Sequence, residues 1–114
     1  LQDSSAASDV YKRQVIHPLV RRHPVTKKPS LFLSPHTMVK IVDYDYDKGR
    51  KLLEKLIEHS IQSKYVYEHI WNNDDIVMWD NRCTMHSVKP FDNNIIKRIM
   101  HRVTLVGDKE PVMA

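Results

Sequence analysis

The chain has 114 residues, 41% of them apolar and 28% charged, a length that suits one small domain or part of a larger one. Its 18 Lys and Arg against 14 Asp and Glu give a net charge of +4, too small to indicate a nucleic-acid-binding protein. The single cysteine excludes an intrachain disulfide and a cysteine-rich zinc site, the two glycines exclude a P-loop and a dinucleotide fingerprint, and the short apolar runs predict no membrane span.

The first 14 residues, LQDSSAASDVYKRQ, are polar and aperiodic, which is typical of a disordered leader. Within them, SAASDVYKRQ resembles the translation of a sequencing adaptor, and the chain begins with Leu rather than Met. We therefore expect the native sequence to start near Val15.

Prolines dominate the next stretch, HPLVRRHPVTKKPS, and each removes a backbone donor and restricts the residue before it. The pattern predicts extended chain with a turn at residues 25–28 between two short strands. The apolar residues 31–33 then predict a short buried strand.

The clearest helix is predicted over about 47–63, with Asp47 as its N-cap. Apolar side chains recur there at helical spacing, with charged residues on much of the remaining surface. The apolar positions are Leu52, Leu53, Leu56, Ile57 and Ile61. Such a helix most simply covers one side of a sheet.

Strand patterns follow the helix. Residues 65–71 and 76–79 flank a polar turn at 72–75 and predict a hairpin, and 84–88 and 98–106 predict further strands. The sum is a mainly β (α+β) fold with one helix, a pattern typical of a jelly roll or of part of a barrel.

One segment carries a family signature. WDNRCTMH, residues 79–86, is followed by RIMHR at 98–102 and by a Gly-Asp pair at 107–108. This combination resembles the C-terminal part of the TauD/TfdA family of Fe(II)- and 2-oxoglutarate-dependent dioxygenases. The upstream HPLVRRHPVTKKPSLF also resembles that family's HPxVRxHPxTGRxxLF stretch, and CTMH with PFD is most similar to the branch acting on aryloxyacetates such as 2,4-dichlorophenoxyacetate.

The resemblance runs from about Val15 to Gly107. It implies that residues 15–107 are the C-terminal part of a double-stranded β-helix (jelly roll) dioxygenase domain, with residues 108–114 as a tail. It further implies Fe(II) as cofactor, 2-oxoglutarate as cosubstrate, and O2 and a small anionic molecule as substrates.

Three residues are implied to form the site. A non-haem Fe(II) oxygenase uses two histidines and one carboxylate as iron ligands, and His86 matches the distal histidine. Arg98 matches the arginine that binds the 5-carboxylate of 2-oxoglutarate, for which a planar guanidinium fork is suited. Arg102 would meet an anionic group of the substrate. If 98–106 is a strand, the spacing of four places both arginines on one face.

The other iron ligands of the family come as His-x-Asp or His-x-Glu, and none of the seven histidines here is followed two residues later by a carboxylate. We therefore expect the chain alone to be inactive. Smaller departures lie in loops: residues 73–75 stand where the family often has a Gly-Asp turn, and Lys28 stands where it often has Gly-Arg.

Structural roles are expected for the remaining residues of the signature. Asp80, Asn81 and Arg82 would set the turn that presents His86, Trp79 would pack in the core, and Cys83 would be a small buried side chain.

Two alternatives stay open: a non-catalytic β-rich anion-binding module and a catalytically dead paralogue. No nucleic-acid or membrane partner is expected, a homo-oligomer of the parent protein is possible, and the expected location is the cytoplasm, since no signal peptide is visible.

Overall fold

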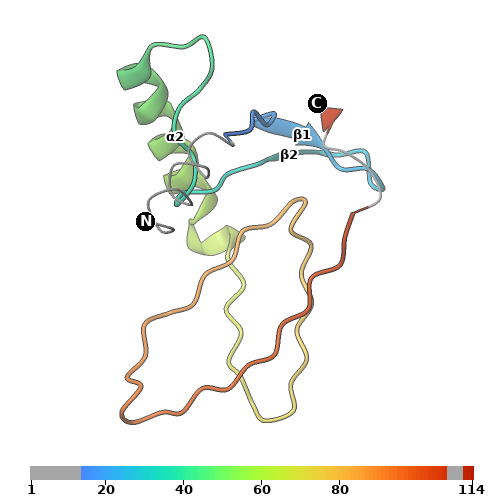
Figure 1. Cartoon of the computed structure of the whole chain (residues 1–114), viewed down its shortest axis with the longest axis vertical. Coiled ribbons are helices and arrows are strands. Elements are labelled where there is room, and N and C mark those ends of the chain that lie inside the picture. The colour runs from blue at the N-terminus through green and yellow to red at the C-terminus, as the bar shows by residue number, and fades with distance from the viewer. Residues whose placement is uncertain (1–13, 108–111) are drawn as a thin grey trace, which may run out of the picture. The chain divides into compact units, whose positions relative to one another are not determined.

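The computed structural model describes residues 14–107 and 112–114 (Figure 1). The predicted leader lies outside this part except for Gln14, and so do residues 108–111 of the predicted tail. The chain divides into two units, one formed by the residues up to Leu31 with those from His101 onward, the other by Phe32–Met100.

The first unit holds a three-stranded antiparallel sheet in the order β2-β1-β3. Strands β1 (Val20–Arg22) and β2 (Pro29–Leu31) pair with Val20 opposite Leu31 (Figure 1). The predicted turn between two short strands is confirmed. The buried strand predicted at residues 31–33 was wrong, because β2 ends at Leu31 and only Leu33 of these three residues is buried.

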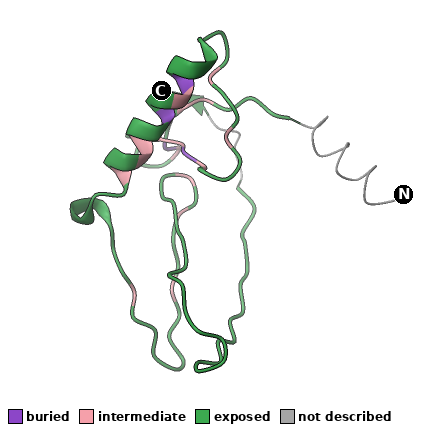
Figure 2. Ribbon diagram, turned by 90° about the vertical axis from the view of Figure 1, so that its left-hand side faces the viewer, coloured by how far each residue is buried: buried purple, intermediate pink, exposed green. Residues whose placement is uncertain are grey.

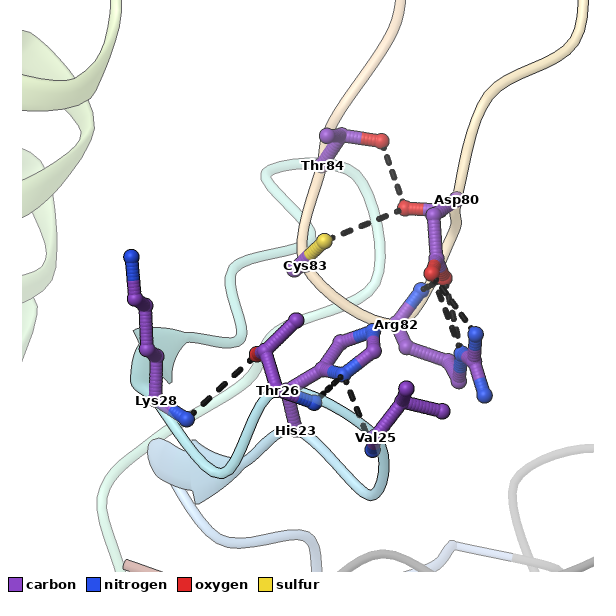
Figure 3. Close-up of polar contacts among 8 residues, drawn as sticks. All are labelled: His23, Val25, Thr26, Lys28, Asp80, Arg82, Cys83 and Thr84. Carbon is purple, nitrogen blue, oxygen red and sulfur yellow. Dashed lines mark hydrogen bonds and ion pairs between the residues drawn. The ribbon is translucent and has the colours of Figure 1, made fainter.

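The turn between β1 and β2 is built on His23, whose side chain is 7% exposed. Its Nδ1 accepts hydrogen bonds from the backbone N–H groups of Val25 and Thr26, each at 3.1 Å (Figure 3). Lys27 has φ 63°, in the left-handed region, and stands at the glycine position of the HPxTGR stretch. The imidazole therefore does for this turn what an Asx side chain does for others.

The third strand, β3 (Val112–Met113), pairs with β1 and was not predicted. Met113 lies opposite Arg21, and the N–H of Ala114 donates to the carbonyl of Val20 at 3.1 Å. A strand of two residues has no periodicity to recognise in a sequence.

The predicted helix is confirmed as α2 (Tyr46–Ser60), followed by a single 3₁₀ turn, η1 (Ser63–Tyr65). The predicted N-cap was wrong by two residues: Asp45 caps the helix, its Oδ2 accepting from the N–H of Lys48 at 3.0 Å. Asp47 lies in the first turn, where its charge still suits the helix dipole.

The core of the second unit is small. Leu53 of α2 is 2% exposed and Leu33 is 5% exposed, and these are its buried apolar side chains. Gly49 is also buried, and a Cβ added there would meet Tyr44 Cδ1 at 3.4 Å. The segment before the helix is tied to it by Arg50, whose Nη1 donates to the carbonyls of Met38 and Val39 at 3.1 and 3.2 Å.

No strand is assigned to residues 66–107, so the strands predicted at 65–71, 76–79, 84–88 and 98–106 are not formed in this structure. The chain there follows an extended path and is exposed along nearly all its length (Figures 1 and 2). Ile76 and Val106 are 95% and 97% exposed, respectively. Alternation of side chains specifies which face a strand would bury, but the ladder also needs a partner strand.

Across the described residues, no helix combines the length and the apolar composition that crossing a membrane requires.

Candidate functional site

The signature segment forms a tight turn at residues 80–84. The Asp80 carboxylate accepts two parallel hydrogen bonds from the Arg82 guanidinium, Nε to Oδ1 at 2.9 Å and Nη2 to Oδ2 at 2.8 Å (Figure 3). The Asp80 carbonyl accepts from Thr84 Oγ1 at 2.6 Å and from the Thr84 N–H at 3.0 Å. Asp80 and Arg82 thus fix the turn that leads to His86, as the sequence predicted.

His86 lies against Trp79, with ring centroids 4.6 Å apart and ring planes inclined by 45°. The indole is itself held, because its Nε1–H donates to Asn81 Oδ1 at 2.9 Å. Within the described residues no hydrogen bond joins either ring nitrogen of His86, so the nitrogen that carries no proton is accessible to a metal ion. Trp79 was predicted to pack in the core; instead it is 38% exposed and contacts the candidate ligand.

Arg98 shows a parallel arrangement. Its guanidinium carbon lies 5.8 Å from the centroid of the Phe91 ring, within the range of a cation–π contact. Phe91 is part of the PFD motif, and its contact with Arg98 was not predicted. The described residues provide no carboxylate to the exposed guanidinium, so its fork is open to an anion.

Arg102 is exposed and belongs to the other unit of the chain. The shared strand face of Arg98 and Arg102 depends on a strand over 98–106, which the structure does not assign. The placement of the two arginines on one face therefore stays a prediction.

Cys83, predicted to be buried, is exposed. Its Sγ lies 3.9 Å from the Asp80 carbonyl oxygen, which places the thiol within the turn rather than beneath it (Figure 3). The turn presents its small side chain to solvent because the backbone of residues 80–84 folds back on Asp80.

A second polar cluster surrounds His69. Its Nε2 lies 3.0 Å from Asp75 Oδ2, and its Nδ1 lies 3.0 Å from the Tyr67 hydroxyl. The N–H of Asn72 donates to the same Asp75 oxygen at 3.0 Å, and Trp71 meets the imidazole edge-on at 4.7 Å. The alternation of residues 67, 69 and 71 along one side of an extended chain was the signal that could have revealed this cluster.

The pKa of the Asp75 carboxyl is lowered from its usual value of 3.8. The main cause is the backbone hydrogen bond from Asn72, followed by the hydrogen bond with His69. Asp75 is therefore an anion at neutral pH and closes the turn at residues 72–75 as a charged acceptor.

The donor set around His86 is incomplete for an iron ion. An exposed imidazole with open nitrogens has the right chemistry for one ligand of a two-histidine, one-carboxylate site. Within the described residues, however, no group of three potential ligands includes His86. The part of the chain that the structure describes thus shows one candidate ligand of such a site at His86.

The comparisons agree with the signature. The model of the "Taurine catabolism dioxygenase TauD, TfdA family" matches residues 2–104. The chain is 38% identical over 91 residues to the alpha-ketoglutarate-dependent 2,4-dichlorophenoxyacetate dioxygenase of Cupriavidus pinatubonensis, covering 80% of this chain and 31% of that protein.

Two further relatives show the same coverage. The (S)-phenoxypropionate/alpha-ketoglutarate-dioxygenase of Delftia acidovorans is 36% identical over 95 residues, covering 83% of this chain and 32% of that protein. Pentalenolactone F synthase of Streptomyces arenae is 36% identical over 93 residues, covering 82% and 31%, respectively. The chain thus spans about a third of the length of these relatives. No solved structure matches the chain.

Proposed function

Because the chain belongs to the TauD/TfdA dioxygenase family, we propose that it is part of an Fe(II)- and 2-oxoglutarate-dependent dioxygenase that hydroxylates a small anionic substrate. The overall reaction consumes O2 and 2-oxoglutarate, places one oxygen atom on the substrate, and releases succinate and CO2. The protein's part is to bind and orient these molecules, while the oxidising power belongs to the metal.

The observation that carries the proposal is the state of His86. The turn at residues 80–84 leads directly to this histidine, one side of its ring lies against Trp79, and its nitrogens are open. A metal ligand needs an unprotonated nitrogen whose lone pair no other donor occupies. We propose that His86 is one iron ligand, completed by a histidine and a carboxylate from a part of the protein that this chain does not contain.

The two arginines have complementary proposed roles. Arg98 would bind the distal carboxylate of 2-oxoglutarate through its open guanidinium fork. Arg102 would bind an anionic group of the substrate. Two of the relatives are named for 2,4-dichlorophenoxyacetate and (S)-phenoxypropionate, which supports an aryloxyalkanoate as substrate. A sulfonate or another carboxylate would satisfy the same arginine.

A chimera tests the proposal. Residues 15–107 replace the matching segment of the Cupriavidus relative, and succinate formation is measured with Fe(II), 2-oxoglutarate and 2,4-dichlorophenoxyacetate. We expect the chimera to turn over, the His86→Ala variant to lose activity, and the Arg98→Ala variant to raise the KM for 2-oxoglutarate. His36→Ala, a change at an exposed histidine outside the signature, is the matched control and keeps activity.

The alternatives make different predictions in the same assay. A folded chimera that is inactive with 2,4-dichlorophenoxyacetate, but binds 2-oxoglutarate in an Arg98-dependent manner, would favour the anion-binding module. A chimera that loses nothing in the His86→Ala variant would overturn the assignment of His86. The signature supplies one of the three proposed iron ligands, so we expect no turnover from the isolated chain under these conditions.

A further inference from the structure

The two principal side chains of the candidate site share one structural device. His86 lies against the Trp79 ring at 4.6 Å between centroids, and Arg98 lies over the Phe91 ring at 5.8 Å. In both cases the polar side chain contacts a ring and has no hydrogen bond or ion pair to the described residues. Trp71 and Tyr67 differ, because the histidine they contact, His69, is also hydrogen-bonded.

We infer that Trp79 and Phe91 are positioning residues, which hold the His86 imidazole through a tilted ring contact and the Arg98 guanidinium through a cation–π contact, and which leave the nitrogen atoms of both side chains accessible to ligands. The inference rests on the proposed function for its purpose, but the orientation itself is a property of this chain.

A ring contact can orient these side chains where no hydrogen bond does so. Metal-binding histidines are commonly oriented by a hydrogen bond to the second ring nitrogen, which fixes the tautomer. A ring face restrains the plane of the imidazole without engaging either nitrogen, and a cation–π contact likewise restrains a guanidinium without using its N–H donors.

The indole is itself anchored to the turn. Its Nε1–H donates to Asn81 Oδ1, and Asn81 lies between Asp80 and Arg82, whose bidentate ion pair fixes the backbone. Trp79 and His86 flank the turn at residues 80–84, so the anchored indole transmits the geometry of the turn to the imidazole.

The first test measures the His86 ring in the isolated chain by NMR. The Trp79 ring current displaces the ring-proton signals of His86, and we expect the Trp79→Leu variant to remove this displacement and Trp79→Phe to restore part of it. Trp71→Leu is the matched control, because Trp71 contacts His69 at 4.7 Å and its loss moves the signals of His69 alone. Circular dichroism of α2 checks that the variants fold.

The second test follows the Arg98 side chain. We expect the Phe91→Leu variant to shift the Arg98 Nε–H signal, Phe91→Tyr to preserve it, and Phe32→Leu, the control at the other phenylalanine, to leave it unchanged. In an active chimera, Trp79→Leu should raise the iron concentration that gives half-maximal turnover by about 10-fold, and Trp79→Phe should restore it.

His86 signals that do not move in the Trp79→Leu variant, or that move equally in the Trp71→Leu variant, overturn the inference. An Arg98 Nε–H signal that does not shift in the Phe91→Leu variant also overturns the inference. These results come from the chain itself, so they stand apart from any failure of the chimera to turn over.

Discussion

His69 Nε2 lies 3.0 Å from Asp75 Oδ2 and thereby closes the turn at residues 72–75 from the side. Residues 67–79 form one hydrogen bond between backbone groups, from the Asp75 N–H to the Asn72 carbonyl at 3.2 Å. The turn therefore depends largely on side chains, and Asp75 is the group that accepts from both the backbone and the imidazole.

The Asp75 contribution to stability depends on pH in a defined direction. Because the folded state lowers the pKa of this carboxyl, the stabilisation is fully present above the unfolded value near 3.8 and is lost as the pH falls through the lower folded value. We expect an NMR titration of the Asp75 side chain to show a midpoint below 3.8. The His69→Gln variant should raise the midpoint only in part, since the hydrogen bond from Asn72 is the larger cause. A midpoint at or above 3.8 would contradict the role of Asp75 as a charged acceptor for Asn72 and His69.

The helix cap can be assigned by two substitutions. Asp45→Ala removes the acceptor for the Lys48 N–H, and we expect a loss of about 1 kcal/mol of stability. Asp47→Ala removes only a charge near the helix dipole and should cost about 0.3 kcal/mol. Thermal melting of α2, followed by circular dichroism, measures both. Equal losses of stability in the two variants, or a larger loss in Asp47→Ala, would support Asp47 as the N-cap, as predicted from the sequence.

Gly49 lies inside α2, where glycine is unfavourable. The added methyl group of Gly49→Ala would sit at ordinary contact distance, 3.4 Å from Tyr44 Cδ1 and 3.7 Å from Ile41 Cβ. We expect the variant to stabilise the helix by about 0.5–1 kcal/mol. Leu53→Ala, which empties the most buried position, should cost about 2–5 kcal/mol and serves as the opposite control. A lower melting temperature for Gly49→Ala would show that the Tyr44 ring cannot yield.

Two loops place non-glycine residues in the left-handed region at positions where the resemblance to the family leads us to expect glycine. Lys27 has φ 63° and Asp74 has φ 69°. We expect Lys27→Gly and Asp74→Gly each to stabilise the chain by roughly 0.5–1 kcal/mol, because the Cβ strain is removed. Lys28→Gly is the control, since Lys28 is not among the residues with positive φ and glycine there adds only flexibility. Denaturant unfolding should give the Lys28→Gly control a lower free energy of unfolding than the parent chain.

The His23 turn depends on one acceptor atom. In an Asn side chain, Oδ1 occupies the place of the imidazole Nδ1, so His23→Asn can still accept from Val25 and Thr26. His23→Leu leaves those two N–H groups without the acceptor and should cost about 1–3 kcal/mol more than His23→Asn. Hydrogen exchange at the two amides measures the difference directly. Equal exchange in both variants would mean that solvent replaces the imidazole.

The sequence predicted those elements whose signals are local. The apolar spacing of α2 and the prolines and turn residues of 24–29 act within a few residues, and both elements are found. The cap was misplaced because Asp45 and Asp47 are both acceptable N-cap residues, and the choice between them depends on backbone dihedral angles. The strands of 66–107 could not form from alternation alone, since a ladder requires a second chain segment to supply the opposing groups.

In the candidate site, too, the local features were predicted and the contacts between more distant residues were not. Asp80 and Arg82 set the turn before His86, as the motif indicated. The contacts of Trp79 with His86 and of Phe91 with Arg98 were missed, because ring contacts between residues seven positions apart in an irregular segment leave no periodic trace.

Each of the two tryptophans touches a histidine, Trp71 at His69 and Trp79 at His86. An excited indole transfers an electron to a protonated imidazole in contact with it far more readily than to a neutral one, so its fluorescence is quenched as the imidazole gains a proton. The tryptophan fluorescence of this chain therefore reports on the protonation of the imidazoles that contact the two indoles. In a Trp71→Phe variant the remaining fluorescence would come from Trp79 and would report on His86 alone, without a label attached to the protein.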